Sequence, residues 1–465
     1  MNAMNRSRFT VAGVAAIVLA CAQPACSAGG AYFSSGHGSA TTGVSRLPAV
    51  YARGECGHCH EAHASQDADS TLYRYNLFAL EEAVCWKCHD GSVTYAADAK
   101  IPFSVTPTNT STDYYKHPIS DLYGGLTPSA HRAGESSPTA FGGASRHAEC
   151  ADCHNPHAAR NDGTPGQSTH TPGGSGGNRI SGALLGATGI VVNAWQAAGQ
   201  PFTTASYSLQ PLNSATTNYE WQICFKCHST FATLPGYTVG SGDFLANKIT
   251  SSATGQVQEY RDVGRAFNPN NPSFHPVTAQ GRNTTIPAAS FNGVWSTTST
   301  MYCSDCHTKA VAASGATGPH GSANMHLLEM PFYLQENTHY TEPTWDEDIG
   351  HDPNELCFKC HRWETYVQKP GSPGADPVTN TNFRKGTNKN LHGMHIGKSK
   401  TAGATCYTCH DVHGTNSDHL INFNLATVTP GGGRNSISAY ETTASGGRCY
   451  VTCHAKVHNP LSYSR

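Results

Sequence analysis

The sequence is poor in charged residues and has no basic run. Lys, Arg, Asp and Glu make up 13% of its 465 residues, about half the roughly 25% that is usual in soluble domains. The formal net charge is −2, and the longest basic cluster is Arg384, Lys385 and Lys389. Nucleic acids and anionic lipid surfaces are bound mainly through clustered Lys and Arg. We therefore expect no nucleic-acid partner.

Long apolar runs are missing after the N-terminal region. Arg6 and Arg8 precede an apolar stretch, residues 9–20, that is too short to span a bilayer. A positive start followed by a short apolar run is typical of a secretory signal peptide. We therefore predict a signal peptide at residues 1–28 and a protein exported to the periplasm, the outer surface or the extracellular space.

Two processing sites fit this signal. The end of the apolar stretch, 18–21, resembles a lipobox, which would make Cys21 a lipid anchor in the outer membrane. Residues 26–28 (Cys-Ser-Ala) instead suit an ordinary signal peptidase, which requires small residues before the cut. We favour the second site because it leaves no surplus thiol.

Residues that build a hydrophobic core are also scarce. Hydrophobic residues make up 38% of the chain, and the 47 glycines together with Ser, Thr and Asn favour turns and loops. Such a chain buries little apolar surface to offset its conformational entropy. We therefore expect a core formed by cofactors and not by side chains.

Cysteine and histidine are abundant, with 18 and 26 copies, and they fall into a repeated motif. Eight times the chain contains two closely spaced cysteines followed at once by histidine, the attachment signal for c-type haem. Two thiols on one turn can each add to a haem vinyl group, and the histidine then binds the iron. The motifs, numbered one to eight below, are Cys56–Cys59–His60, Cys85–Cys88–His89, Cys150–Cys153–His154, Cys224–Cys227–His228, Cys303–Cys306–His307, Cys357–Cys360–His361, Cys406–Cys409–His410 and Cys449–Cys453–His454.

Zinc sites, disulfides and thioredoxin-like pairs are the alternative interpretations of paired cysteines. None of these requires histidine immediately after the second cysteine, so the pattern predicts eight covalently attached haems. The eighth motif has three residues between its cysteines instead of two. We expect this to widen the attachment loop by one residue without changing the order of the ligands.

The motifs form pairs, and the pairs suggest a division of the chain. After the signal peptide, the predicted units are 29–145, 146–300, 301–400 and 401–465. The first member of a pair tends to continue Cys-His-x-x-His, and a histidine follows the second member, twice with proline after it. We predict short helices at 71–89, 219–231 and 352–367, the last capped by Asp352 and Glu355. Loops are predicted at 161–218, 233–300 and 368–390. The expected fold is mostly irregular, with short α-helices wrapped around a stack of eight haems and little β-structure.

The second axial ligands are expected to be histidines, because only four methionines follow the signal while 18 histidines lie outside the motifs. The candidates are His63, His157 and His413 from the Cys-His-x-x-His segments, His117 and His275 from the His-Pro segments, and His320, His392 or His395, and His37. Because His60 and His63 are three residues apart, they lie on one side of a turn and cannot hold the same iron. His63 is therefore predicted to reach a neighbouring haem, which would stack the haems closely.

These segments resemble the multihaem cytochrome c family with doubled Cys-x-x-Cys-His units, which is known from metal- and electrode-reducing bacteria. The resemblance rests on residues 146–157, 267–277, 318–322 and 406–414 and extends over most of 51–454. It implies electron transfer to redox proteins or extracellular acceptors, and some members polymerise into filaments. A homopolymer would follow if His37 bound iron in the next subunit; the alternative is that it folds back onto its own chain.

The competing hypothesis is a multihaem reductase that acts on a small nitrogen or sulfur oxyanion at an iron with an open position. Some such enzymes mark that iron by a lysine in place of the attachment histidine, and this sequence has no Cys-x-x-Cys-Lys. We therefore predict an electron carrier without a catalytic residue.

Overall fold

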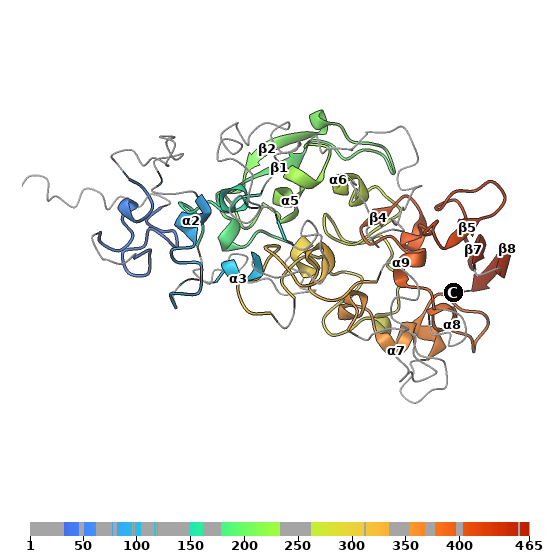
Figure 1. The fold of residues 1–465 in the computed structure, drawn as a ribbon. Helices are drawn as coiled ribbons and strands as arrows, with labels where there is room; N and C mark the ends of the chain where they lie inside the picture. The colour runs from blue at the N-terminus through green and yellow to red at the C-terminus, as the bar shows by residue number, and fades with distance from the viewer. Residues whose placement is uncertain are drawn as a thin grey trace, which may run out of the picture.

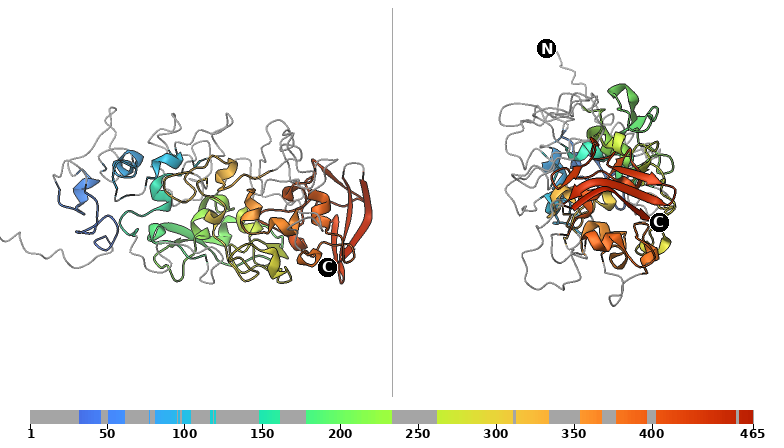
Figure 2. Two further views of the ribbon diagram at one scale, coloured as in Figure 1. Left: turned by 90° about the horizontal axis from the view of Figure 1, so that it is seen from below. Right: turned by 90° about the vertical axis from the view of Figure 1, so that its right-hand side faces the viewer.

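The structure is a computed structural model of residues 1–465, and its chain runs from one end of the molecule to the other in sequence order (Figure 1). It describes residues 32–45, 51–61, 77, 81–94, 96, 98–103, 116–117, 119, 148–160, 178–232, 262–310, 313–333, 354–367, 377–396, 403–453 and 456–464. The later segments gather at the end opposite to the early ones, as the left view of Figure 2 also shows. No helix among the described residues is long and apolar enough to cross a membrane.

The helices are short, as a chain rich in Gly, Ser and Thr leads one to expect. The α-helices are α2 (Glu81–Cys85), α3 (Lys100–Phe103), α4 (Cys150–Cys153), α5 (Trp221–His228), α6 (Val263–Ala266), α7 (Trp363–Tyr366), α8 (Leu391–Ile396) and α9 (Cys406–Cys409). The 3-10 helices are η1 (Cys56–His58), η5 (Gly182–Leu184), η6 (Thr204–Ser206), η7 (Ala288–Ser290), η8 (Cys303–Asp305), η9 (Met325–Leu327), η10 (Leu356–Lys359), η11 (Val378–Asn380) and η12 (Asp418–Leu420).

The predicted helix at 352–367 is wrong as a single element. The structure has η10 and α7 there, with the attachment histidine His361 between them. Glu355 is the residue before η10 and has an extended backbone, so it does not complete a capping box inside a helix. Asp352 lies outside the described residues.

The strands form three small antiparallel sheets. They are β1 (Thr188–Val192) with β2 (Tyr207–Pro211), β3 (Ser273–Phe274) with β4 (Gly414–Thr415), and a sheet of β5 (Val428–Pro430), β6 (Tyr440–Thr443), β7 (Gly446–Cys453) and β8 (Lys456–Ser464). In the last sheet β7 is central, because β5 and β6 pair with its two halves on one side and β8 pairs along the other.

The β1–β2 hairpin corrects the prediction that 161–218 is loop. Its register pairs Ile190 with Leu209 and Val192 with Tyr207, so apolar side chains, two of them β-branched, stand opposite each other across the strands. The signal in the sequence was the run Ile-Val-Val at 190–192, which the surrounding glycines and threonines obscured. The four-stranded sheet is a further strand region that the sequence analysis did not place.

A core of side chains surrounds α5, contrary to the prediction that cofactors alone would form the core. Ile190, Phe202 and Phe225 are completely buried there. The rings of Trp221 and Phe225 lie 4.9 Å apart, and the backbone of α5 comes close to Gly189 of β1. Tightly packed aromatic rings therefore fix α5, which carries the fourth motif, against the hairpin.

Candidate haem-attachment sites

Seven motifs lie on a helical turn with the same backbone geometry. In six of them the N–H of the histidine donates to the carbonyl oxygen of the first cysteine, at 2.8–3.0 Å. The fourth motif reaches the same arrangement because Cys224–His228 lies inside α5. Since this turn places both thiols and the imidazole at one end of a short helix, each motif presents three groups to one cofactor.

The eighth motif differs. Cys449 and Cys453 lie in β7, where Cys449 pairs with Tyr440 and Cys453 with Val428. The expectation that the extra residue only widens a loop is therefore wrong, because the segment between the cysteines is an extended strand. His454 itself lies outside the described residues.

Burial keeps several of the motif thiols protonated. None of the 16 motif cysteines is in a disulfide. Burial raises the pKa of Cys153, Cys227 and Cys306 to about 12. A zinc site or a thioredoxin-like pair requires a thiolate, which this burial disfavours. The arrangement thus fits thiols that are consumed in thioether bonds.

Histidine rings face one another in pairs, and each pair contains one attachment histidine. In six pairs the ring centres are between 6.0 and 6.3 Å apart. The pairs are His60 with His157, His89 with His37, His154 with His320, His228 with His117, His307 with His413, and His410 with His392. For the sixth motif, His361 has His275 as an electrostatic neighbour, which together with burial lowers the pKa of His361 to about 4.

The spacing of these rings fits a metal between them. A metal–imidazole bond is about 2 Å long, so two imidazoles on opposite sides of one metal have centres about 6 Å apart. A van der Waals stack of two rings would be closer than this. The paired rings therefore leave room for one iron, and the adjacent thiol pair supplies the attachment for its porphyrin.

Hydrogen bonds to the backbone select one nitrogen of each ring. Nδ1 of the attachment histidines His154, His307 and His410 lies 2.8–2.9 Å from a carbonyl oxygen. A carbonyl oxygen only accepts, so Nδ1 carries the proton and Nε2 keeps its lone pair for a metal. The acceptors for His307 and His410 are the carbonyls of His326 and His419, two residues that the sequence analysis did not single out and that both have positive φ.

The histidines that face the attachment histidines are called opposing histidines below. Three of them are also held by Nδ1 hydrogen bonds to the backbone, and these bonds connect neighbouring sites. Nδ1 of His37 donates to the carbonyl of Pro156, at 3.1 Å, and Nδ1 of His275 to that of Val412, at 2.7 Å. His117 makes the equivalent bond to Pro319. Each acceptor immediately precedes another opposing histidine, namely His157, His413 and His320. The opposing ligands of sites one and two, three and four, and five and six therefore lie on paired backbone segments.

Burial keeps the imidazoles neutral. It lowers the pKa of His320 to about 3 and also lowers the pKa of His117, His154 and His307. Neighbouring histidines contribute to the shift of His320, because two positive charges at this distance repel. Since only neutral imidazole has a lone pair for a metal, burial holds these rings in the form that binds iron.

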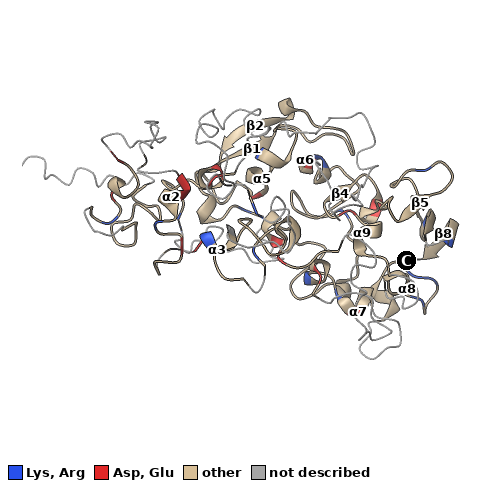
Figure 3. Cartoon of the chain, in the orientation of Figure 1, with Lys and Arg blue, Asp and Glu red and all other residues tan. Residues whose placement is uncertain are grey.

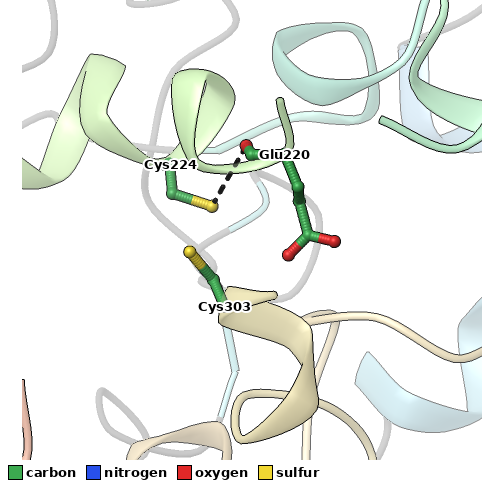
Figure 4. A group of neighbouring side chains, drawn as sticks. All are labelled: Glu220, Cys224 and Cys303. Carbon is green, nitrogen blue, oxygen red and sulfur yellow. Dashed lines mark hydrogen bonds between the residues drawn. The ribbon is translucent and has the colours of Figure 1, made fainter. Parts of the chain in front are cut away.

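A second contact joins the even motifs to the odd motifs that follow them. The first thiols of two motifs meet at Cys85 and Cys150, at Cys224 and Cys303, and at Cys357 and Cys406. Figure 4 shows the middle junction, where the carboxylate of Glu220 lies beside the two sulfurs. Glu220 accepts from the N–H and the hydroxyl of Ser304, at 2.9 and 2.8 Å, and so caps η8. Glu81 makes the corresponding bond to the N–H of Ala151 at the start of α4.

A third contact joins the two motifs within a pair. The buried amine of Lys226, in the fourth motif, donates to the carbonyl of Asp152 in the third, at 2.7 Å. Lys359 of the sixth motif makes the same bond to Asp305 of the fifth, and it also pairs with Glu329. The few charged residues are scattered over the described chain (Figure 3). Lys226 and Lys359 each form a hydrogen bond that joins two motifs.

The structure brings most of the predicted ligands together but leaves two of them outside the described residues, His63 and His454. His37 lies against His89 of its own chain, which is the arrangement expected from the intramolecular alternative. His392 and His395 had been alternatives; His392 faces His410, whereas His395 faces His458. The sequence analysis missed His458, and no motif surrounds it that could have drawn attention to it.

Comparison with known proteins supports this chemistry over part of the chain. No curated protein and no solved structure matches the sequence. Residues 49–94, which contain the first two motifs, match the family model of the doubled CXXCH motif. The match implies covalently bound c-type haem and a general role in electron transfer, so the chain fits a multihaem c-type cytochrome.

Proposed function

We propose that the protein is an exported octahaem cytochrome that conducts electrons along a row of bis-histidine haems. The observation that carries this is the unbroken series of contacts between consecutive sites. Paired backbone segments join sites one and two, three and four, and five and six. Thiol contacts join two and three, four and five, and six and seven. Helix α8 carries the histidines that face the seventh and the last site.

Haem supplies the change of iron charge that electron transfer needs. The chain's own part is to attach each haem through two thiols, to present two imidazoles to it, several of which are oriented by Nδ1 hydrogen bonds, and to hold neighbouring sites in contact. Histidine on both sides lacks the potential-raising effect of methionine, so we expect low potentials. Differences in burial then spread these potentials: Cys56 of the first motif is exposed, whereas the cysteines of the fourth and fifth motifs are partly buried.

The reductase alternative is not favoured by any contact in the described part of the chain. An enzyme of that kind needs an iron with one open position. The first seven attachment histidines each have a second histidine as neighbour, which supports six-coordinate iron at these seven sites.

The expected partners are redox proteins or extracellular electron acceptors outside the cytoplasm. A lipid anchor at Cys21 and assembly into a homopolymer remain proposals that follow from the sequence and the family resemblance. For His37, the contact with His89 within one chain supports the alternative in which His37 folds back onto its own chain.

We expect the denatured protein to carry eight haem increments above its polypeptide mass, because every motif offers two thiols. Intact-mass spectrometry measures this directly. The double variant Cys85→Ala/Cys88→Ala should lose one increment and keep the rest. A mass without any haem would contradict the whole proposal, and seven increments would mean that the motif in β7 is not used.

We also expect all iron to be low-spin, because each of the first seven attachment histidines has a second imidazole as neighbour and the surplus of histidine offers another for the eighth site. Electron paramagnetic resonance of the oxidised protein reads the spin state of each ferric haem. A high-spin signal from the intact protein equal to about one haem in eight would contradict the carrier proposal and favour the reductase.

A further inference from the structure

The last site is built from a strand, and this changes where its axial ligand comes from. In the other motifs a helical turn returns the attachment histidine to the first cysteine through the backbone bond described above. That bond spans four residues, whereas His454 is five residues after Cys449. In addition, Cys449–Cys453 is extended in β7, so the turn that makes the bond is absent.

The two cysteines nevertheless share a face of the sheet. Cys449, Val451 and Cys453 are at alternate positions of β7, whose register with β8 shifts between Cys449 and Val451. All three lie on one face, because both cysteines pack with Val451 in one hydrophobic cluster. This is the inner face, since Val451 is buried and both cysteines pack against the same hydrophobic cluster. Tyr450 lies on the other face, where the guanidinium of Arg434 covers its ring.

His458 is the residue of β8 directly opposite Val451. Directly opposed residues of an antiparallel pair have side chains on the same face of the sheet. His458 therefore stands between the two cysteines and on their side, while its neighbour Val457 is 69% exposed on the outer side. The strand pairing places this imidazole where a helical turn places it in the other motifs.

A second histidine faces His458 at the spacing found in the other pairs. The ring centres of His458 and His395 are 6.2 Å apart, against 6.0–6.3 Å in the six pairs described above. Nδ1 of His395 donates to the carbonyl of Leu391 at 2.7 Å, so Nε2 is the nitrogen that keeps its lone pair.

The relative position of the two rings is held by the backbone. Ser464, at the end of β8, exchanges two hydrogen bonds with Arg384, at 2.9 and 3.1 Å. The next residue back, Phe383, accepts from the N–H of Leu391 at the start of α8 and stacks on His395. β8 and α8 are thus tied together, and with them His458 and His395.

From this geometry we infer that His458 and His395 are the axial ligands of the haem attached to Cys449 and Cys453, with His458 in the role that the motif assigns to His454. The inference rests on the proposed function, because it assumes that the eighth motif carries a haem. Wild-type intact mass tests that assumption separately from the ligand assignment.

Substituting His458→Ala should leave eight haem increments in the mass and turn about one-eighth of the iron high-spin. The matched control is Val457→Ala, which truncates the neighbouring residue of β8, 69% exposed on the outer side of the sheet. The control should stay low-spin throughout. A fully low-spin His458→Ala protein with eight haems would overturn the assignment, and so would a wild-type protein with seven.

A second variant covers the case in which the alanine protein fails to fold. His458→Met keeps a side chain that can bind iron, so all haems should remain low-spin while one of them is easier to reduce. A spectroelectrochemical titration should then show a new wave at higher potential that accounts for about one haem in eight. A role for His458 in packing alone would leave the titration curve unchanged, and that result would also overturn the inference.

Discussion

Replacing His413 with alanine should expose the iron of the fifth motif and not that of the seventh, in which His413 lies. The ring of His413 is 6.3 Å from that of His307, which follows Cys306. Loss of this imidazole leaves the iron with one axial ligand from the protein. About one-eighth of the haem should therefore become high-spin, and the reduction potential of the fifth haem should rise. Electron paramagnetic resonance and a redox titration measure the two effects.

The site that changes can be identified by removing haems one at a time. Adding Cys303→Ala/Cys306→Ala to His413→Ala should abolish the high-spin signal, whereas adding Cys406→Ala/Cys409→Ala should preserve it. The opposite pattern would show that His413 serves its own motif and would contradict the cross-linked row of sites.

A matched control for His413 is available beside the same iron site. His326 also neighbours His307, but its backbone carbonyl and not its ring accepts from Nδ1 of His307. His326 has φ 62°, a conformation that asparagine tolerates better than other residues with a Cβ. His326→Asn should therefore remain low-spin, while His413→Ala does not.

Gly414→Ala should disturb two sites at once. A Cβ at this position would come within 2.0 Å of the carbonyl oxygen of Ala266, and a backbone atom cannot rotate out of the way as a side chain can. Gly414 pairs with Phe274 between β3 and β4, and the flanking residues are His413 and His275. We expect a loss of about 1–3 kcal/mol in unfolding free energy and high-spin iron at both the fifth and the sixth sites.

The control for this prediction is Gly281→Ala. The atoms nearest to a Cβ there are 3.8 and 3.9 Å away, which is ordinary contact. Its thermal unfolding temperature, followed by circular dichroism, should match that of the wild type, and its iron should stay low-spin. Equal unfolding temperatures for the two variants would show that the β3–β4 contact does not hold the ligands.

Gly321 occupies the equivalent place one repeat earlier. It follows His320, bridges to Lys116, and its Cβ would meet the carbonyl oxygen of Pro102 at 2.1 Å. At both positions a third backbone segment comes close to the residue that follows the opposing histidine. This close approach explains why that residue is glycine. The sequence contained this signal as His-Gly at 320–321 and 413–414, but it could not reveal which segment approaches.

Local chemistry decided what could be inferred from the sequence alone. Cys56, Cys59 and His60 specify haem attachment within a segment of five residues. The attachment motifs therefore predict haem, and the surplus of histidine over methionine predicts the type of axial ligand, without knowledge of the fold. The argument that two histidines three residues apart serve different irons is also local, because it follows from the geometry of one turn.

Only the tertiary structure decided which histidine faces which, because the pairs join residues far apart in the chain. His60 meets His157 and His154 meets His320, across separations that no local rule specifies. The choice of His392 for His410 and of His395 for His458 depends on how α8 lies between η12 and β8. The strand at the eighth motif is decided in the same way: three partner strands supply β7 with its hydrogen bonds, and Cys449–Cys453 is extended because those partners are present.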